Sequence, residues 1–268
     1  MEKQYHIGFD DTHGASYAIL PGDPGRVEKI ASLLENPRFY CQNREYTTWL
    51  GELSPSNESP KKTVMVISTG MGGPSTAIAV EELYKTGVRN FIRVGTCGGM
   101  ALPVTGGDLV IATGAIRMEG TSKEYVPIEF PAVANLDITN ALVTAAKALG
   151  AQWHAGVVQC KDSFYGQHSP QRMPCGAELM NKWDAWIKAG CLASEMESSA
   201  LYIVSQVLGV RAGCVLSVVW NQERARAGMS NPECHDTSLA AKCAVEAVRI
   251  LMKKFNHERH EPPQTIGE

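Results

Sequence analysis

Apolar runs alternate with amphipathic stretches along most of the chain, which predicts strands separated by helices. Short runs rich in β-branched residues, such as Thr-Val-Met-Val-Ile-Ser at 63–68, are typical of buried strands. Longer stretches with apolar residues three and four positions apart are typical of helices that pack one face on a sheet. The predicted strands are residues 17–20, 63–68, 91–94, 108–118, 155–160 and 213–220. The predicted helices are residues 24–34, 74–86, 138–149, 177–188, 195–208 and 236–255.

The alternation of strands and helices also predicts how the sheet is built. Parallel strands need long crossover connections, so strands separated by helices indicate a mostly parallel sheet covered on both faces. We therefore predict an α/β protein. Neither a linker nor an internal repeat interrupts the pattern, so residues 1–255 are expected to form a single domain. The polar residues 256–268 are expected to form a disordered tail.

Three segments are rich in turn-forming residues, and two of them lie where α/β proteins bind ligands. Residues 54–62 predict a plain surface loop. Residues 162–176 and 221–235 each follow a predicted strand, at the carboxyl edge of the sheet. We expect these two loops to border a binding site.

Composition argues against several classes of protein. The net charge of −3 gives no general attraction to nucleic acid or to an anionic membrane. No apolar run near the N-terminus resembles a signal peptide, and none has the length of a transmembrane helix, so we expect a cytoplasmic location without membrane partners. The eight cysteines form no C-x-x-C pair, which predicts reduced thiols. The histidines have no metal-ligand spacing, so no firm metal site is predicted.

The segment Pro-Gly-Asp-Pro-Gly-Arg at 21–26 lies between a predicted strand and helix. Its glycines let backbone N–H groups close on an anion, and Arg26 adds positive charge near the helix start. The alternative is a tight turn with a solvated arginine. The spacing of the residues alone slightly favours this alternative over an anion site. A second glycine-rich segment, residues 68–76, is interpreted mainly as tight strand–helix packing.

Arg93 lies inside an otherwise apolar strand and is followed by Gly95, Thr96 and two further glycines. Burying a guanidinium without an anionic partner is costly, so Arg93 requires either a bound anion or a carboxylate of the protein. The two interpretations are about equally good. Glu195 and Glu197 are candidates for such a carboxylate or for sugar recognition. On a helix they would point apart, whereas in an extended turn they would share a face, and either could instead complement a helix N-terminus.

Taken together, these segments resemble those of a known family, the uridine phosphorylases among the nucleoside phosphorylases. The similarity extends over residues 5–255. The matching segments are HIG (6–8), LPGDPGRVEKIA (20–31), REYTTW (44–49), STGMGGPSTAIAVEEL (68–83), RVGTCGG (93–99), EFPAV (129–133), DSFYGQ (162–167) and EMES (195–198).

The resemblance implies a phosphate site, a ribose site and a base site. The residues that match the family's phosphate ligands are Gly22, Arg26, Arg93, Thr96 and, from the neighbouring subunit, Arg44. Those that match its ribose contacts are Met196, Glu197 and His6, the last reaching across a subunit interface. Those placed at the base are Phe164 and Gln167, with Arg172 as the nearest arginine. The positions that hold a monovalent cation such as K⁺ in some members are Glu45, Met71 and Ser75.

Two departures affect the base site. The segment Phe-Tyr-Gly-Gln-His-Ser-Pro-Gln-Arg lacks the proline before the glycine, and its arginine lies five residues after Gln167 instead of two. Gln222 also stands where many members have arginine. The resemblance further implies a three-layer α/β sandwich around a partly barrel-like mixed sheet, and a hexamer built from dimers.

The implied activity is phosphorolysis of uridine to uracil and ribose 1-phosphate in nucleoside salvage, with thymidine or deoxyuridine as further candidate substrates. Inorganic phosphate is then a co-substrate, and no organic cofactor is expected. The alternatives are a purine nucleoside phosphorylase, a hydrolytic nucleosidase of the same fold, and a non-catalytic nucleoside-binding protein. The segment Ser-Val-Val-Trp-Asn-Gln-Glu-Arg at 217–224 has no aspartate to protonate a purine, which favours a pyrimidine.

Overall fold

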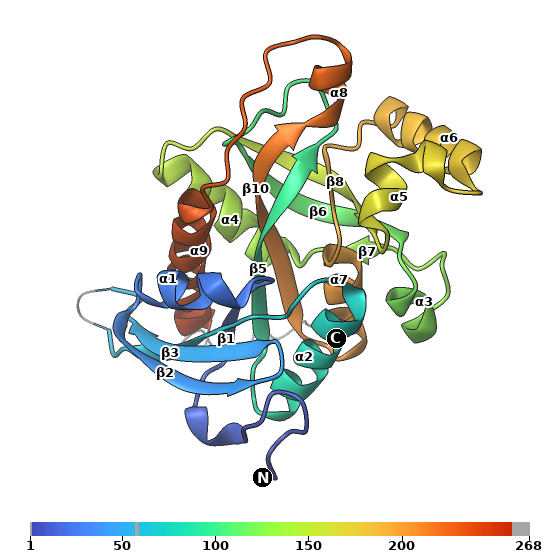
Figure 1. Cartoon of the computed structure of the whole chain (residues 1–268). Coiled ribbons are helices and arrows are strands. Elements are labelled where there is room, and N and C mark those ends of the chain that lie inside the picture. Colours follow the sequence, from blue (N-terminus) through green and yellow to red (C-terminus); the bar gives the residue numbers. More distant parts are fainter. Residues whose placement is uncertain (1, 57–58, 259–268) are drawn as a thin grey trace, which may run out of the picture.

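Ten strands form one mixed sheet within residues 2–56 and 59–258, the part of the chain that the computed structural model describes (Figure 1). The strands are β1 (Tyr17–Pro21), β2 (Glu35–Asn43), β3 (Tyr46–Leu53), β4 (Lys62–Ile67), β5 (Asn90–Gly99), β6 (Leu109–Met118), β7 (Ala132–Val133), β8 (Trp153–Lys161), β9 (Ala193–Glu195) and β10 (Arg211–Asn221).

Five of these strands close into a ring. β5 pairs in parallel with β10, which pairs antiparallel with β6, and β6 pairs in parallel with β8. β8 then pairs in parallel with β9, and β9 returns antiparallel to β5. From β5, the strands β1, β4, β3 and β2 extend as an open sheet. The predicted mixed sheet with a partly barrel-like centre is therefore confirmed.

Helices cover both faces of this sheet. The α-helices are α1 (Val27–Ala31), α2 (Gly73–Lys85), α3 (Thr121–Tyr125), α4 (Leu136–Ala148), α5 (Phe164–His168), α6 (Gly176–Lys188), α7 (Ser198–Val207), α8 (Gln222–Arg226) and α9 (Ser238–Glu258). Short 3-10 segments are η1 (Asp11–His13), η2 (Pro24–Arg26) and η3 (Pro170–Arg172). Figure 1 shows α1, α4 and α9 on one side of the sheet and α2 and α7 on the other.

The alternation of side chains along each strand produces two apolar cores. In β1, Ala18 and Leu20 pack in the core with α2 and α7, whereas Tyr17 and Ile19 pack in the core with α1, α4 and α9. Successive strand residues point to opposite faces, and both faces are buried here, so the strand reads as a continuous apolar run. The three layers follow directly from that pattern.

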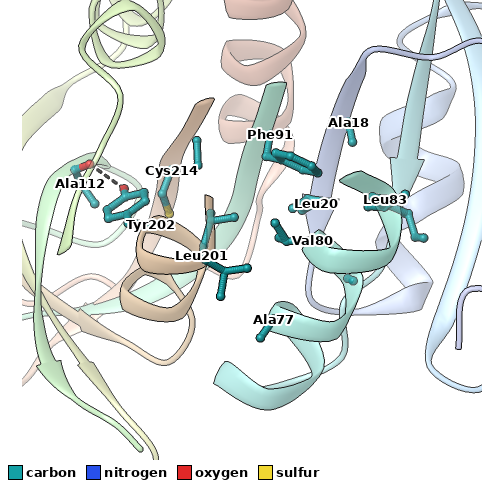
Figure 2. Packing of buried hydrophobic residues seen from close by; sticks show 14 of the residues in the cluster. Ala18, Leu20, Ala77, Val80, Leu83, Phe91, Ala112, Leu201, Tyr202 and Cys214 are labelled. Carbon is teal, nitrogen blue, oxygen red and sulfur yellow. Dashed lines mark hydrogen bonds between the residues drawn. The ribbon is translucent and has the colours of Figure 1, made fainter. Parts of the chain in front are cut away.

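Figure 2 shows the core on the α2 and α7 side. Val80 of α2 and Leu201 of α7 lie toward Leu20 and Phe91 of the sheet. Tyr202 is almost fully buried, and its hydroxyl donates a hydrogen bond of 2.7 Å to the Ala112 carbonyl oxygen. A buried hydroxyl without such a partner would be costly, so this bond fixes α7 against β6.

Several predicted boundaries are wrong for local reasons. The predicted helix 24–34 begins as a 3-10 turn and is α-helical only over Val27–Ala31. The predicted strand 91–94 continues through the glycines to Gly99, because its backbone pairs with β10 and β9. The helix expected from residue 195 begins at Ser198. The loop 162–176 contains η3 and α5, and Ser163 caps the start of α5. The loop 221–235 contains α8, whose start is capped by Asn221.

The hairpin of β2 and β3 was not predicted. β2 is mostly exposed and contains a proline, so its apolar alternation is weak, and it lies at the edge of the sheet. The hairpin nevertheless carries Arg44 and Glu45 at its turn.

Three further predictions concern the C-terminal tail, the state of the cysteines and the absence of a membrane helix. Helix α9 extends to Glu258, so the first three residues of the predicted tail are helical, and residues 259–268 lie outside the described part. All eight cysteines are free thiols. Among the described helices, none is long and apolar enough to cross a membrane.

Candidate active site

A cavity of about 620 Å³ opens at the carboxyl ends of β1, β5, β8 and β9. Nine of the predicted site residues, drawn from distant parts of the sequence, line it. They are Gly22, Arg26, Met71, Arg93, Thr96, Phe164, Gln167, Met196 and Glu197. The fold therefore brings most of the predicted phosphate, ribose and base residues into one space.

Arg93 lines this cavity, and the glycine two residues on leaves room for its guanidinium. A Cβ atom at Gly95 would lie 2.9 Å from Arg93 Nη2, so a larger residue would displace the guanidinium. Arg93 is 5% exposed, and its Nε and Nη1 atoms have no hydrogen-bond partner. Nη1 lies 3.7 Å from the position of a Cβ atom at Gly22. The Nη1 donor thus lies beside the turn at 21–26, and a buried donor needs an acceptor.

The carboxylates of Glu197 and Glu195 provide the internal partners for Arg93. Arg93 Nη2 donates to Glu197 Oε2, and Arg93 Nε lies 3.6 Å from Glu195 Oε2. Burial alone lowers the pKa of Arg93, but Glu197 and Glu195 outweigh that effect and raise it. The internal ion pair considered from the sequence therefore exists, and it lies within the cavity.

The two glutamates have different roles, because they lie in an extended turn before α7. Glu195 accepts hydrogen bonds from the backbone N–H groups of Glu197 and Ser198, at 2.9 and 3.0 Å, and so complements the helix start. Glu197 makes no capping bond with its side chain and instead faces Arg93. Burial raises the pKa of Glu197, although Arg93 opposes that shift.

The glycine-rich segment 68–76 packs closely against α3 and also positions the Glu197 carboxylate. A Cβ atom at Gly73 would lie 2.9 Å from Thr121 Oγ1, so this glycine allows close packing. Gly72 has φ of 92°, a conformation that favours glycine, and its N–H donates to Glu197 Oε1 at 2.6 Å. The segment therefore fixes the Glu197 carboxylate between a backbone donor and Arg93.

The turn at 21–26 presents its backbone to the same cavity. Asp23 accepts a hydrogen bond of 2.8 Å from Gly25 N and lies 3.7 Å from Arg26 Nε, so both ends of the turn are tied together. The Arg26 side chain is 26% exposed and lines the cavity. A Cβ atom at Gly22 would lie only 2.9 Å from the Gly70 carbonyl oxygen.

We expect Gly22→Ala to raise the KM for phosphate by roughly 10-fold or more, since backbone atoms must shift to relieve that contact and misplaced ligands are costly to catalysis. Gly25→Ala is the matched control in the same turn, because its Cβ atom would meet the Asp23 carboxylate, a mobile side chain, at 3.2 Å. Steady-state kinetics at varied phosphate compare the two. Equal KM values in both variants would contradict the role given to Gly22.

The base end of the cavity contains two residues that the sequence analysis missed, Lys161 and Ser194. Lys161 Nζ donates to Ser194 Oγ at 2.7 Å, and Ser194 Oγ donates to Gln167 Oε1 at 2.6 Å. Phe164 lies on the same short helix as Gln167 and is half exposed. A charged residue at the end of an apolar strand, directly before a predicted binding loop, was the available signal for Lys161.

Arg172 does not line the cavity. Its guanidinium lies 5.9 Å from the centre of the Tyr165 ring. Gln222 does not line the cavity either, and the nearby Glu223 accepts hydrogen bonds from Trp183 and Arg226. The base end therefore has Lys161 as its lining lysine, while the predicted arginine lies elsewhere.

His6 and Arg44 also lie outside the cavity and form a separate group with the β2–β3 turn. Asn43 Nδ2 donates to the His6 carbonyl oxygen at 2.8 Å, and Arg44 packs over the Tyr5 ring at 5.5 Å. His6 Nδ1 lies 2.6 Å from Glu82 Oε1, a partner that no motif indicated. Arg44 has φ of 53°, a left-handed conformation at the β2–β3 turn that is uncommon for a residue other than glycine.

The three residues aligned with the cation site adjoin this group. A Cβ atom at Gly70 would lie 3.0 Å from Glu45 Cγ and 3.4 Å from Ser75 Oγ, and Ser75 Oγ donates to the Met71 carbonyl oxygen at 3.2 Å. A carboxylate, a hydroxyl and a carbonyl are oxygen ligands of the kind that hard cations prefer. In the described residues, no group of three or more His, Cys, Asp or Glu side chains could hold a metal ion.

Fold and cavity together define an α/β protein in which a guanidinium with an unpaired donor lies beside a buried carboxylate in one cavity. Comparison with known proteins identifies the family. The pattern of the Phosphorylase superfamily matches residues 16–252. The chain therefore belongs to the Phosphorylase superfamily.

Individual relatives are similar over nearly their whole length. The chain is 53% identical over 249 residues to a uridine phosphorylase of Treponema pallidum, covering 93% of this chain and 94% of that protein. It is 40% identical to a uridine phosphorylase of Escherichia coli, covering 92% and 98%. It is 43% identical to a uridine phosphorylase of Thermococcus kodakarensis, covering 92% and 86%.

Proposed function

We propose that the protein is a uridine phosphorylase, which uses inorganic phosphate to convert uridine to uracil and ribose 1-phosphate in nucleoside salvage. The observation that carries this proposal is the shared cavity, where Arg93 has an unpaired donor, Nη1, beside Gly22 and also binds Glu197. The uridine phosphorylases to which the chain is similar support the choice of substrate.

In this mechanism a phosphate oxygen attacks C1′ of the ribose from the face opposite the base. The C1′–N1 bond breaks, its electron pair passes to the base, and the configuration at C1′ inverts. Arg93 and Arg26 hold the phosphate through charge-assisted hydrogen bonds and place its negative charge beside the positive C1′. Thr96 and the backbone at Gly22 complete this subsite.

The sugar and the base occupy the rest of the cavity. Glu197 accepts hydrogen bonds from the 2′- and 3′-hydroxyls, and Met196 packs against the ribose. Because Arg93 Nη2 binds Glu197 while its Nη1 is unpaired, one guanidinium links the phosphate and ribose subsites. Phe164 packs against the pyrimidine ring and Gln167 contacts its polar edge.

The alternatives fit the site less well. A hydrolytic nucleosidase has no need for guanidinium donors directed at a phosphate. A purine phosphorylase would need an acid near the base, but Glu223, the carboxylate of the segment after β10, is bound by Trp183 and Arg226. A non-catalytic descendant would not be expected to retain both Arg93 and Glu197.

We further propose a cytoplasmic homo-oligomer, a hexamer built from dimers. Tyr5 is 74% exposed and Met71 85% exposed beside His6 and Arg44, which suits a subunit interface. In the dimer, His6 and Arg44 would reach the ribose and phosphate of the neighbouring cavity. Glu45, Ser75 and the Met71 carbonyl would hold a monovalent cation such as K⁺ at that interface.

Sharing of the site predicts that two variants with impaired activity can restore each other. Mixing Arg44→Ala with Glu197→Gln and allowing subunit exchange should rebuild intact sites, up to about one in four, because each mixed dimer contains one site with both native residues. Activity is measured before and after exchange. Each variant exchanged with itself is the control, and absence of any gain in the mixture would contradict sharing.

The proposed function is tested by supplying uridine, thymidine and inosine side by side with phosphate and measuring release of the free base. Uridine should be cleaved fastest. Preferential cleavage of inosine would instead identify a purine phosphorylase.

A further inference from the structure

Lys161 is a buried cation that the proposed mechanism does not use. It ends strand β8, is 4% exposed and lines the base end of the cavity. On its other side it lines a second cavity of about 390 Å³, whose wall includes Trp183, Trp186 and Leu179. Lys161 and Gln167 are the polar side chains that border both spaces at once. Burying an ammonium group is costly, so a retained buried lysine calls for a role.

The hydrogen bonds of Lys161 have a fixed direction. An ammonium group can only donate, so Ser194 Oγ accepts the bond from Lys161 Nζ at 2.7 Å. The hydroxyl hydrogen of Ser194 is then directed to Gln167 Oε1, at 2.6 Å. Because the carbonyl oxygen of the Gln167 amide is bound in this way, its NH₂ group is the end turned away from Ser194. The Lys161–Ser194–Gln167 chain thus determines which end of the amide faces the base.

The direction of the amide matters for the departing base. When the C1′–N1 bond breaks, the electron pair delocalises onto the two carbonyl oxygens of the pyrimidine. An NH₂ donor stabilises such an oxygen, whereas a carbonyl at the same place would repel it. A positive charge two hydrogen bonds behind the donor polarises the chain and strengthens its last bond.

We propose that Lys161 and Ser194 are positioning residues that hold the Gln167 NH₂ group toward the base and stabilise, through it, the negative charge of the departing pyrimidine. This inference rests on the proposed function. Lys161 then supplies the positive charge near the base, because Arg172 lies over Tyr165 instead. It also favours bases with a carbonyl oxygen at that edge, the chemical class of uracil and thymine.

The electrostatic surroundings of Lys161 act in both directions. Burial lowers the pKa of Lys161, while Glu195 and Glu197 partly oppose that shift and favour the charged form. The role given to Lys161 therefore stands on its position at the cavity and on its hydrogen bond to Ser194.

The test compares two substrates that differ in the leaving base. 5-Fluorouracil is more acidic than uracil, so it leaves more easily and needs less stabilisation. In Lys161→Met, kcat for uridine should fall by about 10–100-fold, as for other lost electrostatic donors. The loss for 5-fluorouridine should be at least about threefold smaller, because a better leaving group depends less on catalysis of its departure. KM for uridine should change less than kcat.

Ser194→Ala is the second variant, because it interrupts the chain without removing the buried charge. We expect the same unequal loss on the two substrates. Lys242→Met, which removes an exposed lysine on α9, is the matched control and should behave as wild type. Circular dichroism and thermal melting establish that each variant is folded, and Ser194→Ala carries the test if Lys161→Met is not.

Three outcomes would overturn the inference. Equal losses on both substrates in both variants would make Lys161 and Ser194 merely structural. An unequal loss in Lys161→Met with wild-type kinetics in Ser194→Ala would mean that the charge does not act through Ser194. Failure of the wild-type protein to cleave uridine with phosphate would overturn the proposed function and this inference with it, whereas the first two results leave the proposed function intact.

Discussion

Arg93→Lys should lower kcat/KM by about 100–1000-fold, the range found when a positioned donor of a developing charge is lost. Lysine keeps the positive charge but has no planar fork. Its single nitrogen therefore cannot occupy both positions, the one where Arg93 Nη2 binds Glu197 and the one where Nη1 lies free beside Gly22. Kinetics at varied phosphate and at varied uridine should show losses for both substrates, because the residue links both subsites.

Lysine is preferred to alanine in this experiment. Removing the guanidinium altogether would leave Glu197 buried without its partner, and such a change costs about 3–5 kcal/mol of folding free energy. Arg89→Lys is the matched control, since Arg89 lies just before β5, is exposed and binds the backbone carbonyl oxygens of Tyr84 and Val88. Near-wild-type kinetics of Arg93→Lys would show that its fork is not used.

Glu197→Gln should lower kcat/KM for uridine by about 10–100-fold, and by less for 2′-deoxyuridine. Hydrogen bonds to a charged acceptor contribute about 1.5–3 kcal/mol each, and deoxyuridine has no 2′-hydroxyl to lose. The preference for uridine should also depend on pH. Burial raises the pKa of Glu197, so its carboxylate is present above that raised pKa and is lost as the pH falls through it.

The ratio of kcat/KM for uridine to that for deoxyuridine isolates this effect, because titration of phosphate affects both substrates equally. The ratio should decrease toward acid pH in the wild type and remain constant in Glu197→Gln. Glu195→Gln is the control on the same turn. Because Glu195 binds the backbone at the start of α7, its loss should lower the melting temperature, and the ratio should still decrease toward acid pH because Glu197 keeps its carboxylate. Equal, near-wild-type turnover of both substrates by Glu197→Gln would place the sugar elsewhere.

The elements that the sequence predicted well have strong local patterns. Buried strands such as β4 and β10 are continuous apolar runs, and α2, α4 and α6 end at glycines with positive φ or near them. The β2–β3 hairpin was missed because β2 is exposed at an edge, where packing imposes little pattern. The predicted strand 91–94 ended before the glycines that follow Arg93, but pairing with β10 continues the strand through them.

The site residues likewise divide into those that local motifs predicted and those that they did not. Residues within recognisable motifs, such as Gly22, Arg93 and Glu197, were predicted and meet in the cavity. The sequence could not decide between the extended and helical placement of Glu195 and Glu197, because that depends on where α7 begins. Lys161 and Ser194 were missed because their function depends on a contact between β8 and β9, which no local spacing encodes.

The central claim, phosphorolysis of uridine in the Arg93 cavity, is tested most directly by proton and phosphorus NMR of the wild-type protein with uridine, since the proton spectrum reports uridine, uracil and ribose and the phosphorus spectrum reports ribose 1-phosphate. With inorganic phosphate present, uracil and ribose 1-phosphate should appear in equal amounts. In phosphate-free buffer, uridine should persist. Release of uracil and free ribose at the same rate without phosphate would contradict the account and identify a hydrolase.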